Sequence, residues 1–428
     1  MSRIPLFAQI LIALVLAVVV GYVSTPESTL YPVYEFLATL FLNALKMIIV
    51  PLVMASIIIG VAGIGGTHGL GRLGGRTLLF YITTSFFAIV TGLLLVNIIA
   101  PGVVSAELAQ QMIAMAGKEA AGELPDLAGR DISGLWDVFL SMVPPNIIAA
   151  AANGQLLGLI FFAILYGYFL SRIDEPFAES QYNFWQGVLQ IMMKITELIM
   201  KFAPLGVFAL VAKVMAGIDP DFLSEFASTI GLFFFTVVLA LLAHLLITLP
   251  VLLYFVARVN PLRHFRAMAP ALLTAFSTAS SSATLPLTME CVEKNAGVSN
   301  RTTSFVLPLG ATVNMDGTAL YECVVAIFIA QLYGMELSFT TQFLIVWTAL
   351  ITSIGVAGIP SASLVAITII LGTIGLPLEA IAVVWLVDRV LDMMRTAVNI
   401  FSDSCGAVII GKLEGEQGIL ESAARNGP

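Results

Sequence analysis

A polar stripe near the end of the chain carries the residue types that hold ions and charged small molecules. Residues 388–403 read DRVLDMMRTAVNIFSD, and at about 100° per residue one side of a helix collects three carboxylates, a guanidinium and an amide. These are Asp388, Asp392, Arg395, Asn399 and Asp403. A guanidinium binds carboxylates through a planar fork, and carboxylates attract cations. The stripe therefore predicts a binding surface with a wet face, and the opposite, apolar side suits protein or lipid.

This helix is expected in a membrane, because the whole chain has the composition of a polytopic membrane protein. Hydrophobic residues make up 59% of the 428 residues and charged residues 11%, whereas soluble domains carry about 25% charged residues. Several continuous apolar runs reach the roughly 20 residues that cross a bilayer. They are residues 7–23, 36–61, 78–100, 156–170, 189–215, 230–256, 324–332, 343–354 and 364–376. The fold class is therefore an all-α polytopic membrane protein, and a β-barrel is excluded because its strands would alternate.

Charges are costly in this setting. Each ion inside a membrane helix costs roughly 2.5 to 3.5 kcal/mol on insertion scales, and function usually accounts for its presence. Most of the basic residues lie in loops or tails that can share one side: Arg3, Arg72, Arg76, Arg172, Arg258, Arg263, Arg266, Lys294, Arg301, Lys412 and Arg425. The positive-inside rule then puts both termini in the cytoplasm. We expect a multi-pass protein of the plasma membrane, the inner membrane of a prokaryote. Residues 7–23 are long for a signal-peptide core, which favours a retained span.

Other kinds of site find little support. The three cysteines and three histidines lack the spacing of a metal site or a disulfide framework. No segment resembles a phosphate loop or a nucleic-acid patch, and no nucleophile with a general base is suggested. Neither an enzyme nor a nucleic-acid partner is predicted.

The C-terminal half contains two interrupted hydrophobic segments. In the first, residues 267–276 form a short apolar arm before STASSSATLP and residues 305–309 form another short run after it. In the second, residues 343–354 and 364–376 flank GVAGIPSAS. Each pair of arms precedes or follows a helix with acids and amides inside it, such as GATVNMDGTALYE. Broken helices expose backbone groups that lipid cannot solvate, so they line enclosed cavities, as in transporter sites at the membrane midplane. Two kinked helices packed through small residues would explain the glycines but not the acids.

The charge balance of these elements suggests a ligand. Arg395 can hold a carboxylate, and Asp392 less than one turn away can hold an ammonium group. Hydroxyls and helix N-termini at the hairpin tips can take a second carboxylate. Asp316 and Asp403 remain for cations, and oxygen ligands suit Na⁺. We therefore expect an acidic amino acid with several Na⁺ ions, while a structural salt bridge from Arg395 to Asp388 or Asp392 stays an alternative.

At these residues the chain resembles the glutamate transporter family, the dicarboxylate/amino acid:cation symporters. The matching segments lie between about residues 36 and 410: NALKMIIVPLV, FAPLGVFAL, SSSATLP, LPLGATVNMDGTALYE, SIGVAGIP and VLDMMRTAVNIFSDS. The resemblance implies eight transmembrane helices, two re-entrant helical hairpins with inverted repeats, a homotrimer and elevator-type transport. It divides the chain into scaffold helices 1 and 2 (1–76), helix 3 of the transport domain (77–100), an external loop with scaffold helices 4 and 5 (101–216), and the rest of the transport domain (217–428).

The resemblance also implies roles for single residues. The substrate would be bound by Ser280, Ser281, Ser282, Thr318, Ile359, Pro360, Ser361, Ala362, Ser363, Asp392, Arg395, Thr396 and Asn399. One Na⁺ site would use Gly310, Asn314, Asn399 and Asp403, and a second Thr312, Met315, Ser353, Ile354 and Val356. A third would use Tyr81, Thr84, Ser85, Asn314 and Asp316. Glu322 resembles the glutamate proposed to carry a proton in the animal members, and no organic cofactor is implied.

Two departures from the family pattern bear on these roles. Many members place an additional arginine at a position corresponding to Ala279 or Met393, and here both are uncharged. Ser363 stands at a hairpin tip often occupied by glycine. Transport of a C4-dicarboxylate or a neutral amino acid by the same fold, and an ion channel or sensor, are the competing functions.

Overall fold

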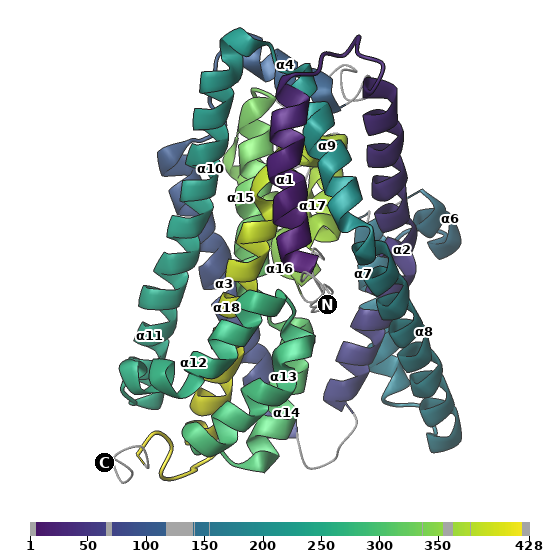
Figure 1. Ribbon diagram of the computed structural model, residues 1–428. Coiled ribbons are helices and arrows are strands. Elements are labelled where there is room, and N and C mark those ends of the chain that lie inside the picture. Colours follow the sequence, from purple (N-terminus) through teal and green to yellow (C-terminus); the bar gives the residue numbers. More distant parts are fainter. Residues whose placement is uncertain are drawn as a thin grey trace, which may run out of the picture.

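The computed structural model describes residues 6–65, 71–116, 140, 142–153, 155–335, 337–353, 363–376 and 378–421. Within these ranges every regular element is a helix (Figure 1). The first half contains α1 (Leu6–Tyr22), α2 (Tyr31–Gly65), α3 (Gly71–Ile99), α4 (Ala106–Ala116), α6 (Ile147–Ala152), α7 (Leu156–Leu170), α8 (Glu175–Lys201) and α9 (Ala203–Gly217). The second half contains α10 (Leu223–Ala243), α11 (Leu249–Leu252), α12 (Pro261–Thr278), α13 (Ser281–Glu290), α14 (Asn300–Val313), α15 (Asp316–Leu332), α16 (Phe339–Ser353), α17 (Ser363–Thr373) and α18 (Trp385–Leu413).

Among the described residues, three helical stretches are long and apolar enough to cross a membrane: Arg72–Ile99, Leu223–Ala257 and Asn300–Leu332. A fourth is possible if α8 and α9, which meet at a bend of 57°, form one broken span. The longest of them, Leu223–Ala257, joins α10 to α11 through π-helical turns and has a mean hydropathy of 2.7. The expectation of an all-α protein with several spans is confirmed for the described residues, while the count of eight spans and two re-entrant hairpins stays a prediction.

The helices pack in two groups; in Figure 1, α2, α7 and α8 lie at the right and α3 and α10 at the left, while α1 and α9 appear in the middle together with α15 and α17. In one group α2 packs against α7, α8 and α9, and α1 lies along α9. In the other, α15 packs against α3, α16, α17 and α18, while α12 and α14 pack against α18. Contacts between the groups run from α9 to α18, from α2 to α14 and from α7 to α16. The polar residues singled out in the sequence lie almost entirely on the second group.

The centre of the second group is the interrupted span α14–α15. Its apolar window is completely enclosed by protein, in contrast to the spans of α3 and α10, which expose most of theirs. The helix ends at Val313 and resumes at Asp316, because Asn314 and Met315 adopt non-helical backbone angles. Such a break leaves backbone amides and carbonyls without helical partners. Lipid cannot supply these partners, so the break has to be buried among polar groups of the protein.

A second break separates α12 from α13, which pack against each other as a hairpin. Ala279 takes a left-handed conformation (φ 50°) and ends α12, and the Ser280 hydroxyl then accepts a hydrogen bond from the Ala283 amide to begin α13. A serine at this capping position satisfies an amide that the first helical turn leaves free. The interruption predicted around STASSSATLP is therefore confirmed as a tight helix–turn–helix.

Candidate functional site

The polar stripe of α18 is buried instead of wet. The residues of this stripe from Asp388 to Asp403 are at most 6% exposed, and the opposite face carries the equally buried Leu391, Val398 and Phe401. The predicted wet face is wrong in this respect, since α18 is enclosed by α12, α14 and α15. Charges buried at this depth need partners with good geometry. Those partners come partly from α18 itself and partly from the break between α14 and α15.

Arg395 and three neighbouring charges form a continuous ion-pair chain along α18. The guanidinium donates from Nη1 to Asp388 Oδ1 at 3.0 Å and from Nη2 to Asp392 Oδ1 at 2.9 Å. The second oxygen of Asp392 accepts from Arg389 Nη1 at 3.3 Å. Arg395 also lies 3.8 Å above the ring of Tyr321. The alternative of a salt-bridged Arg395 is thus realised with both carboxylates, and the two positive and two negative charges balance.

The start of α15 fits closely against the middle of α18. The Gly317 amide donates to Asn399 Oδ1 at 2.8 Å, and Asn399 Nδ2 donates to the Thr318 hydroxyl at 3.1 Å. A Cβ on Gly317 would lie 2.8 Å from the carbonyl oxygen of Arg395, so a larger residue would separate the helices. Thr396 donates to a carbonyl of its own helix at 2.8 Å. Of the predicted substrate residues, Asn399 and Thr318 are therefore in direct contact.

Asp316 is the centre of a buried hydrogen-bond cluster that joins four helical segments. Its Oδ1 accepts from the Ser85 hydroxyl of α3 at 2.7 Å. Its Oδ2 accepts from the Ser402 hydroxyl of α18 at 2.6 Å and lies 3.0 Å from His244 Nε2. All four side chains are at most 3% exposed. A carboxylate so enclosed is held in one orientation, which is what an oxygen ligand for a small cation requires.

Asp403 lies beside this cluster and is held by the break in α14–α15. Asn314 Nδ2 donates to Asp403 Oδ1 at 2.9 Å, and the Thr84 hydroxyl donates to Asn314 Oδ1 at 3.3 Å. A Cβ on Gly310 would meet the Asp403 carboxylate and would lie 2.7 Å from the hydroxyl of Tyr81. The predicted first and third ion groups thus share one region of hydroxyl, amide and carboxylate oxygens. Among the described residues no cluster of three or more His, Cys, Asp or Glu is arranged to hold a metal ion.

The hairpin residues are only partly described. Ser280, Ser281 and Ser282 lie at the start of α13, with Ser281 buried. Ser363 begins α17, is 3% exposed, and its hydroxyl has no hydrogen-bond partner within the described ranges. The remaining tip residues, Ile354, Val356, Ile359, Pro360, Ser361 and Ala362, lie outside the described residues.

Among the described residues, no hydrogen bond joins the members of the second predicted ion group to one another. The Thr312 hydroxyl donates to the Leu309 carbonyl at 3.1 Å and the Ser353 hydroxyl to the Leu350 carbonyl at 2.9 Å. Met315 is buried in the break. Because Ile354 and Val356 belong to the same group and are not described, this group stays a prediction.

Glu322 is buried within α15 and faces the first arm of the second hairpin. Its Oε2 accepts from the Thr352 hydroxyl of α16 at 3.0 Å. Its Oε1 has no hydrogen-bond partner in the described part of the chain. Within the described part of the chain, Glu322 thus differs from Asp316, both of whose carboxylate oxygens have hydrogen-bond partners.

His244 and Ser402 were not identified as site residues from the sequence. Metal-ligand spacing was the wrong test for His244, since its partner Asp316 lies 72 residues away. The available signal was an ionisable side chain inside the apolar run LLAHLL, which requires a buried partner in a membrane span. Ser402 had no separate signal, because serines in membrane helices usually bond their own backbone.

Arg389 was missed as well. Positions 279 and 393 lack the additional cation of many resembling proteins, which left Arg395 as the one fixed cation. The structure nevertheless brings a second guanidinium to Asp392 from Arg389, three residues before it. An i, i+3 spacing on a helix was the signal.

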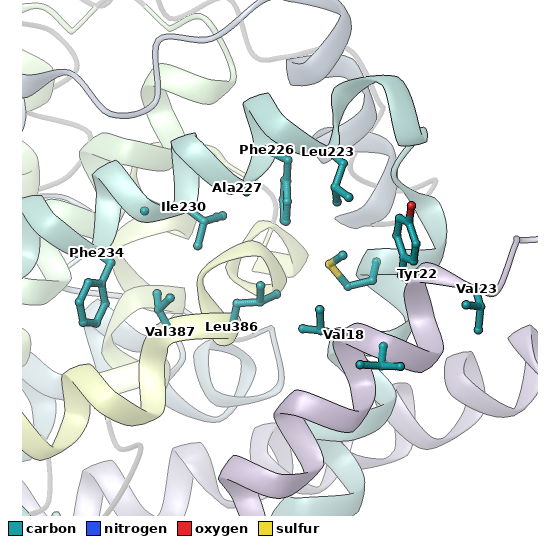
Figure 2. Close-up of a pocket in the computed structure, with 13 residues that line it drawn as sticks. Val18, Tyr22, Val23, Leu223, Phe226, Ala227, Ile230, Phe234, Leu386 and Val387 are labelled. Carbon is teal, nitrogen blue, oxygen red and sulfur yellow. The ribbon is translucent and has the colours of Figure 1, made fainter.

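A cavity of about 790 Å³ lies away from this polar region, between α1, α9, α10 and the start of α18 (Figure 2). Figure 2 shows hydrocarbon side chains around nearly its whole wall: Val18, Val23, Leu223, Phe226, Ile230, Phe234, Leu386 and Val387. Burying an ionised carboxylate against such a wall without a partner is strongly unfavourable. This cavity is therefore not the site of a charged substrate.

Comparison with known proteins identifies the family to which this chain belongs. A model described as the sodium:dicarboxylate symporter family matches residues 6–413. The chain is 34% identical over 420 residues to the proton/sodium-glutamate symport protein of Geobacillus stearothermophilus, covering 97% of this chain and 96% of that protein. It is 35% identical over 416 residues to the proton/glutamate-aspartate symporter of Escherichia coli (strain K12), covering 95% and 92%. It is 34% identical over 453 residues to excitatory amino acid transporter 3 of Mus musculus, covering 94% and 84%.

Proposed function

Because the chain belongs to the sodium:dicarboxylate symporter family, a family of multi-pass membrane transporters and not of enzymes, we propose that it imports L-glutamate or L-aspartate in symport with Na⁺. The observation that carries this proposal is the enclosed Arg395 with Asp392 beside it, adjacent to the oxygen-rich cluster of Asp316 and Asp403. Arg395 suits a substrate carboxylate, Asp392 suits an ammonium group, and Asp316 and Asp403 suit accompanying cations. The names of the related proteins, which include glutamate and aspartate symporters, support the same assignment.

In this proposal Arg395 exchanges partners when the substrate arrives. Its guanidinium turns from Asp388 and Asp392 to the side-chain carboxylate of the substrate, because a charged fork prefers a bidentate carboxylate. Thr318 and Asn399 present a hydroxyl and an amide beside it. Asp392 accepts the ammonium group, and Thr396 completes this wall. The hairpin residues Ser280, Ser281, Ser282, Ile359, Pro360, Ser361, Ala362 and Ser363 take the main-chain carboxylate.

Sodium is cargo in this mechanism and its ligands lie beneath the substrate. One ion is held by Gly310, Asn314, Asn399 and Asp403, and another by Tyr81, Thr84, Ser85, Asn314 and Asp316. The two share Asn314 in the break of α14–α15, so binding of one ion orders the ligands of the other. The remaining ion, that of the second predicted group, is held by Thr312, Met315, Ser353, Ile354 and Val356. Sodium thereby stabilises the same break that supports Thr318, which couples ion binding to substrate binding.

The proposed transport motion is a slide of one helix group past the other. The group of α2, α7, α8, α9 and α1 corresponds to a scaffold, and the group around α15 and α18 to the transport domain. Their separate packing supports this division. We propose eight spans with two re-entrant hairpins, assembly as a homotrimer, and both termini in the cytoplasm of the cell whose plasma membrane holds the protein.

Proton coupling is assigned to Glu322. Its carboxyl contacts Thr352 on the hairpin arm that would have to open for substrate exchange. A proton on Glu322 neutralises a charge buried between α15 and α16, so the loaded and empty carriers could differ by one proton.

Replacement of Arg395 by Cys tests the substrate assignment. The variant is expected to lose Na⁺-driven aspartate uptake in proteoliposomes and to gain preference for neutral amino acids, because the carboxylate partner is removed. Arg172→Cys serves as a matched control, since Arg172 is exposed and stacks on Tyr168 outside the site. Unchanged aspartate uptake by the Arg395 variant would refute the assignment. Accumulation of substrate against its gradient separates a symporter from an ion channel or sensor.

A second candidate substrate is an amine-free C4-dicarboxylate. The observation that favours it is the second guanidinium beside Asp392, which opposes an ammonium group at that place. Competition by succinate without competition by aspartate would support this candidate over the first.

A further inference from the structure

Asp392 bridges two guanidinium groups. Its Oδ1 accepts from Arg395 Nη2 at 2.9 Å, and its Oδ2 accepts from Arg389 Nη1 at 3.3 Å. Arg389 is only 8% exposed, and its Nε has no hydrogen-bond partner among the described residues. The mechanism above uses Arg395 and Asp392 but leaves Arg389 without a role. An arginine buried to this degree in a membrane helix is expensive unless it contributes to function.

The place of Arg389 on α18 brings it to the boundary between the two helix groups. Trp385, one turn earlier on the same side of α18, packs edge-on against Phe41 of α2 with the ring centres 5.5 Å apart. The side chain of Arg389 therefore lies on the face of α18 that looks toward the proposed scaffold, next to Asp392.

The two arginines differ in the number of carboxylates that hold them. Arg395 contacts both Asp388 and Asp392, whereas within the described ranges Arg389 forms an ion pair with Asp392 alone. When Arg395 turns to a substrate carboxylate, Arg389 continues to neutralise Asp392. Without Arg389, Asp392 would lose one of the two guanidinium groups that contact it, so it would attract Arg395 more strongly and compete more strongly with any substrate carboxylate. An ammonium group next to Asp392 would, in contrast, be bound more strongly, because a repelling charge had gone.

We propose that Arg389 is a specificity-determining residue, which lowers the preference for amine-bearing over amine-free dicarboxylates by holding the second oxygen of Asp392. The inference rests on the proposed function, in which Asp392 accepts the substrate ammonium group. Both consequences of Arg389 act in the same direction: its positive charge favours a dianion such as succinate and disfavours the ammonium group of aspartate. Arg389 thus sets the ratio of the two affinities, while Arg395 binds the carboxylate common to both substrates.

The test compares the wild type with Arg389→Met and Arg389→Lys in proteoliposomes. Methionine keeps a long side chain without charge, and lysine keeps the charge without the fork. The KM for L-aspartate and the inhibition constant of succinate are measured from Na⁺-driven uptake. We expect Arg389→Met to raise the ratio of the succinate constant to the aspartate KM by about tenfold, which corresponds to about 1.4 kcal/mol and is well below the interaction of two unit charges about 4 Å apart at an effective dielectric constant of about 20. Arg389→Lys is expected to stay within about threefold of the wild-type ratio, since the charge remains.

An unchanged or lower ratio in Arg389→Met overturns the inference, and so does an equal rise in both variants, which would indicate a role of shape alone. Should Arg389→Met not elute as a folded protein in size-exclusion chromatography, Arg389→Gln, which retains a donor for Asp392, replaces it with the same expectation. The wild type gives the separate test of the proposed function. Absence of Na⁺-driven aspartate uptake there refutes that function, whereas normal wild-type uptake with an unaltered ratio in the variant refutes only the role of Arg389.

Discussion

Replacing Gly310 by Ala should weaken Na⁺ binding without unfolding the protein. Gly310 lies on α14, one turn before the break, and faces two proposed ion ligands. A Cβ there would come within 2.7 Å of the carboxyl carbon of Asp403 and 2.7 Å of the hydroxyl of Tyr81. Ordinary contacts of a Cβ begin at about 3.4 Å. The Asp403 carboxylate cannot move freely, because Asn314 donates to it at 2.9 Å and α18 is buried around it.

The magnitude follows from this crowding. Because both contacts would be 2.7 Å where ordinary contact begins at 3.4 Å, the carboxylate and the hydroxyl each have to move by at least about 0.7 Å. Overpacking of this kind costs typically about 1 to 3 kcal/mol. If the displaced ligands can bind Na⁺ only by returning toward their original positions, that cost appears in the ion-bound state. The Na⁺ concentration for half-maximal uptake should then rise by roughly 5- to 150-fold.

The assay is the initial rate of L-aspartate uptake into proteoliposomes as a function of external Na⁺. Gly187→Ala is the matched control, because Gly187 lies within α8 and no atom stands within 4 Å of the position its Cβ would take. This control should leave the Na⁺ dependence unchanged, so that a general effect of alanine in a helix is excluded. A wild-type Na⁺ dependence in Gly310→Ala, for protein of normal elution volume, would refute the assignment of Asp403 and Tyr81 as ion ligands.

Two further predictions concern carboxyl groups. Glu322→Gln should abolish the pH dependence of net transport and spare substrate exchange, because the amide oxygen can still accept from Thr352 but cannot take up a proton; proton flux in proteoliposomes measures this. Glu416, beyond the end of α18, accepts hydrogen bonds from Ser299 Oγ and Thr302 Oγ1, both at 2.6 Å. Burial alone would raise the pKa of Glu416, but these hydrogen bonds outweigh burial and lower the pKa below its ordinary value of 4.5. The ionised Glu416 therefore contributes to stability above pH 4.5, and this contribution is lost as the pH falls through the lowered pKa. Glu416→Gln should lower the free energy of unfolding at pH 7 by about 1 kcal/mol after screening, and with it the unfolding midpoint. The difference from the wild type should vanish in acid.

Each of these has its own control. Thr352→Val removes the hydrogen bond to Glu322 but leaves the carboxyl, so it should retain pH-dependent transport, and persistent proton coupling in Glu322→Gln would contradict the proton assignment. Glu421→Gln should not change the unfolding midpoint, because Glu421 is 71% exposed and lies 3.6 Å from Lys412. A pH-independent difference between Glu416→Gln and the wild type would contradict the ionised state of Glu416.

Much of this protein could be inferred from its sequence because the membrane restricts what each residue type means. Long apolar runs predict helices, and charges or hydroxyls within them predict contacts with other polar groups. The stripe of α18 was predicted by helical periodicity, and the interruption before α13 by the small hydroxyl residues of STASSSATLP, whereas the break at Asn314 was not predicted. The hydroxyls of Tyr81, Thr84 and Ser85 were weak signals alone, and the resemblance to a family was needed to assign them.

Only the tertiary structure decided which polar groups meet. Ser85 meets Asp316 across 231 residues of chain, and His244 meets the same carboxylate across 72 residues. Periodicity places a residue on one face of its helix, but it does not say which helix covers that face or how deeply. This is why the stripe of α18 was predicted to be wet and is in fact enclosed. The pairing of Arg389 with Asp392 lies within one turn, yet it depends on the rotamers that the surrounding helices allow, and no pattern in the sequence determines those.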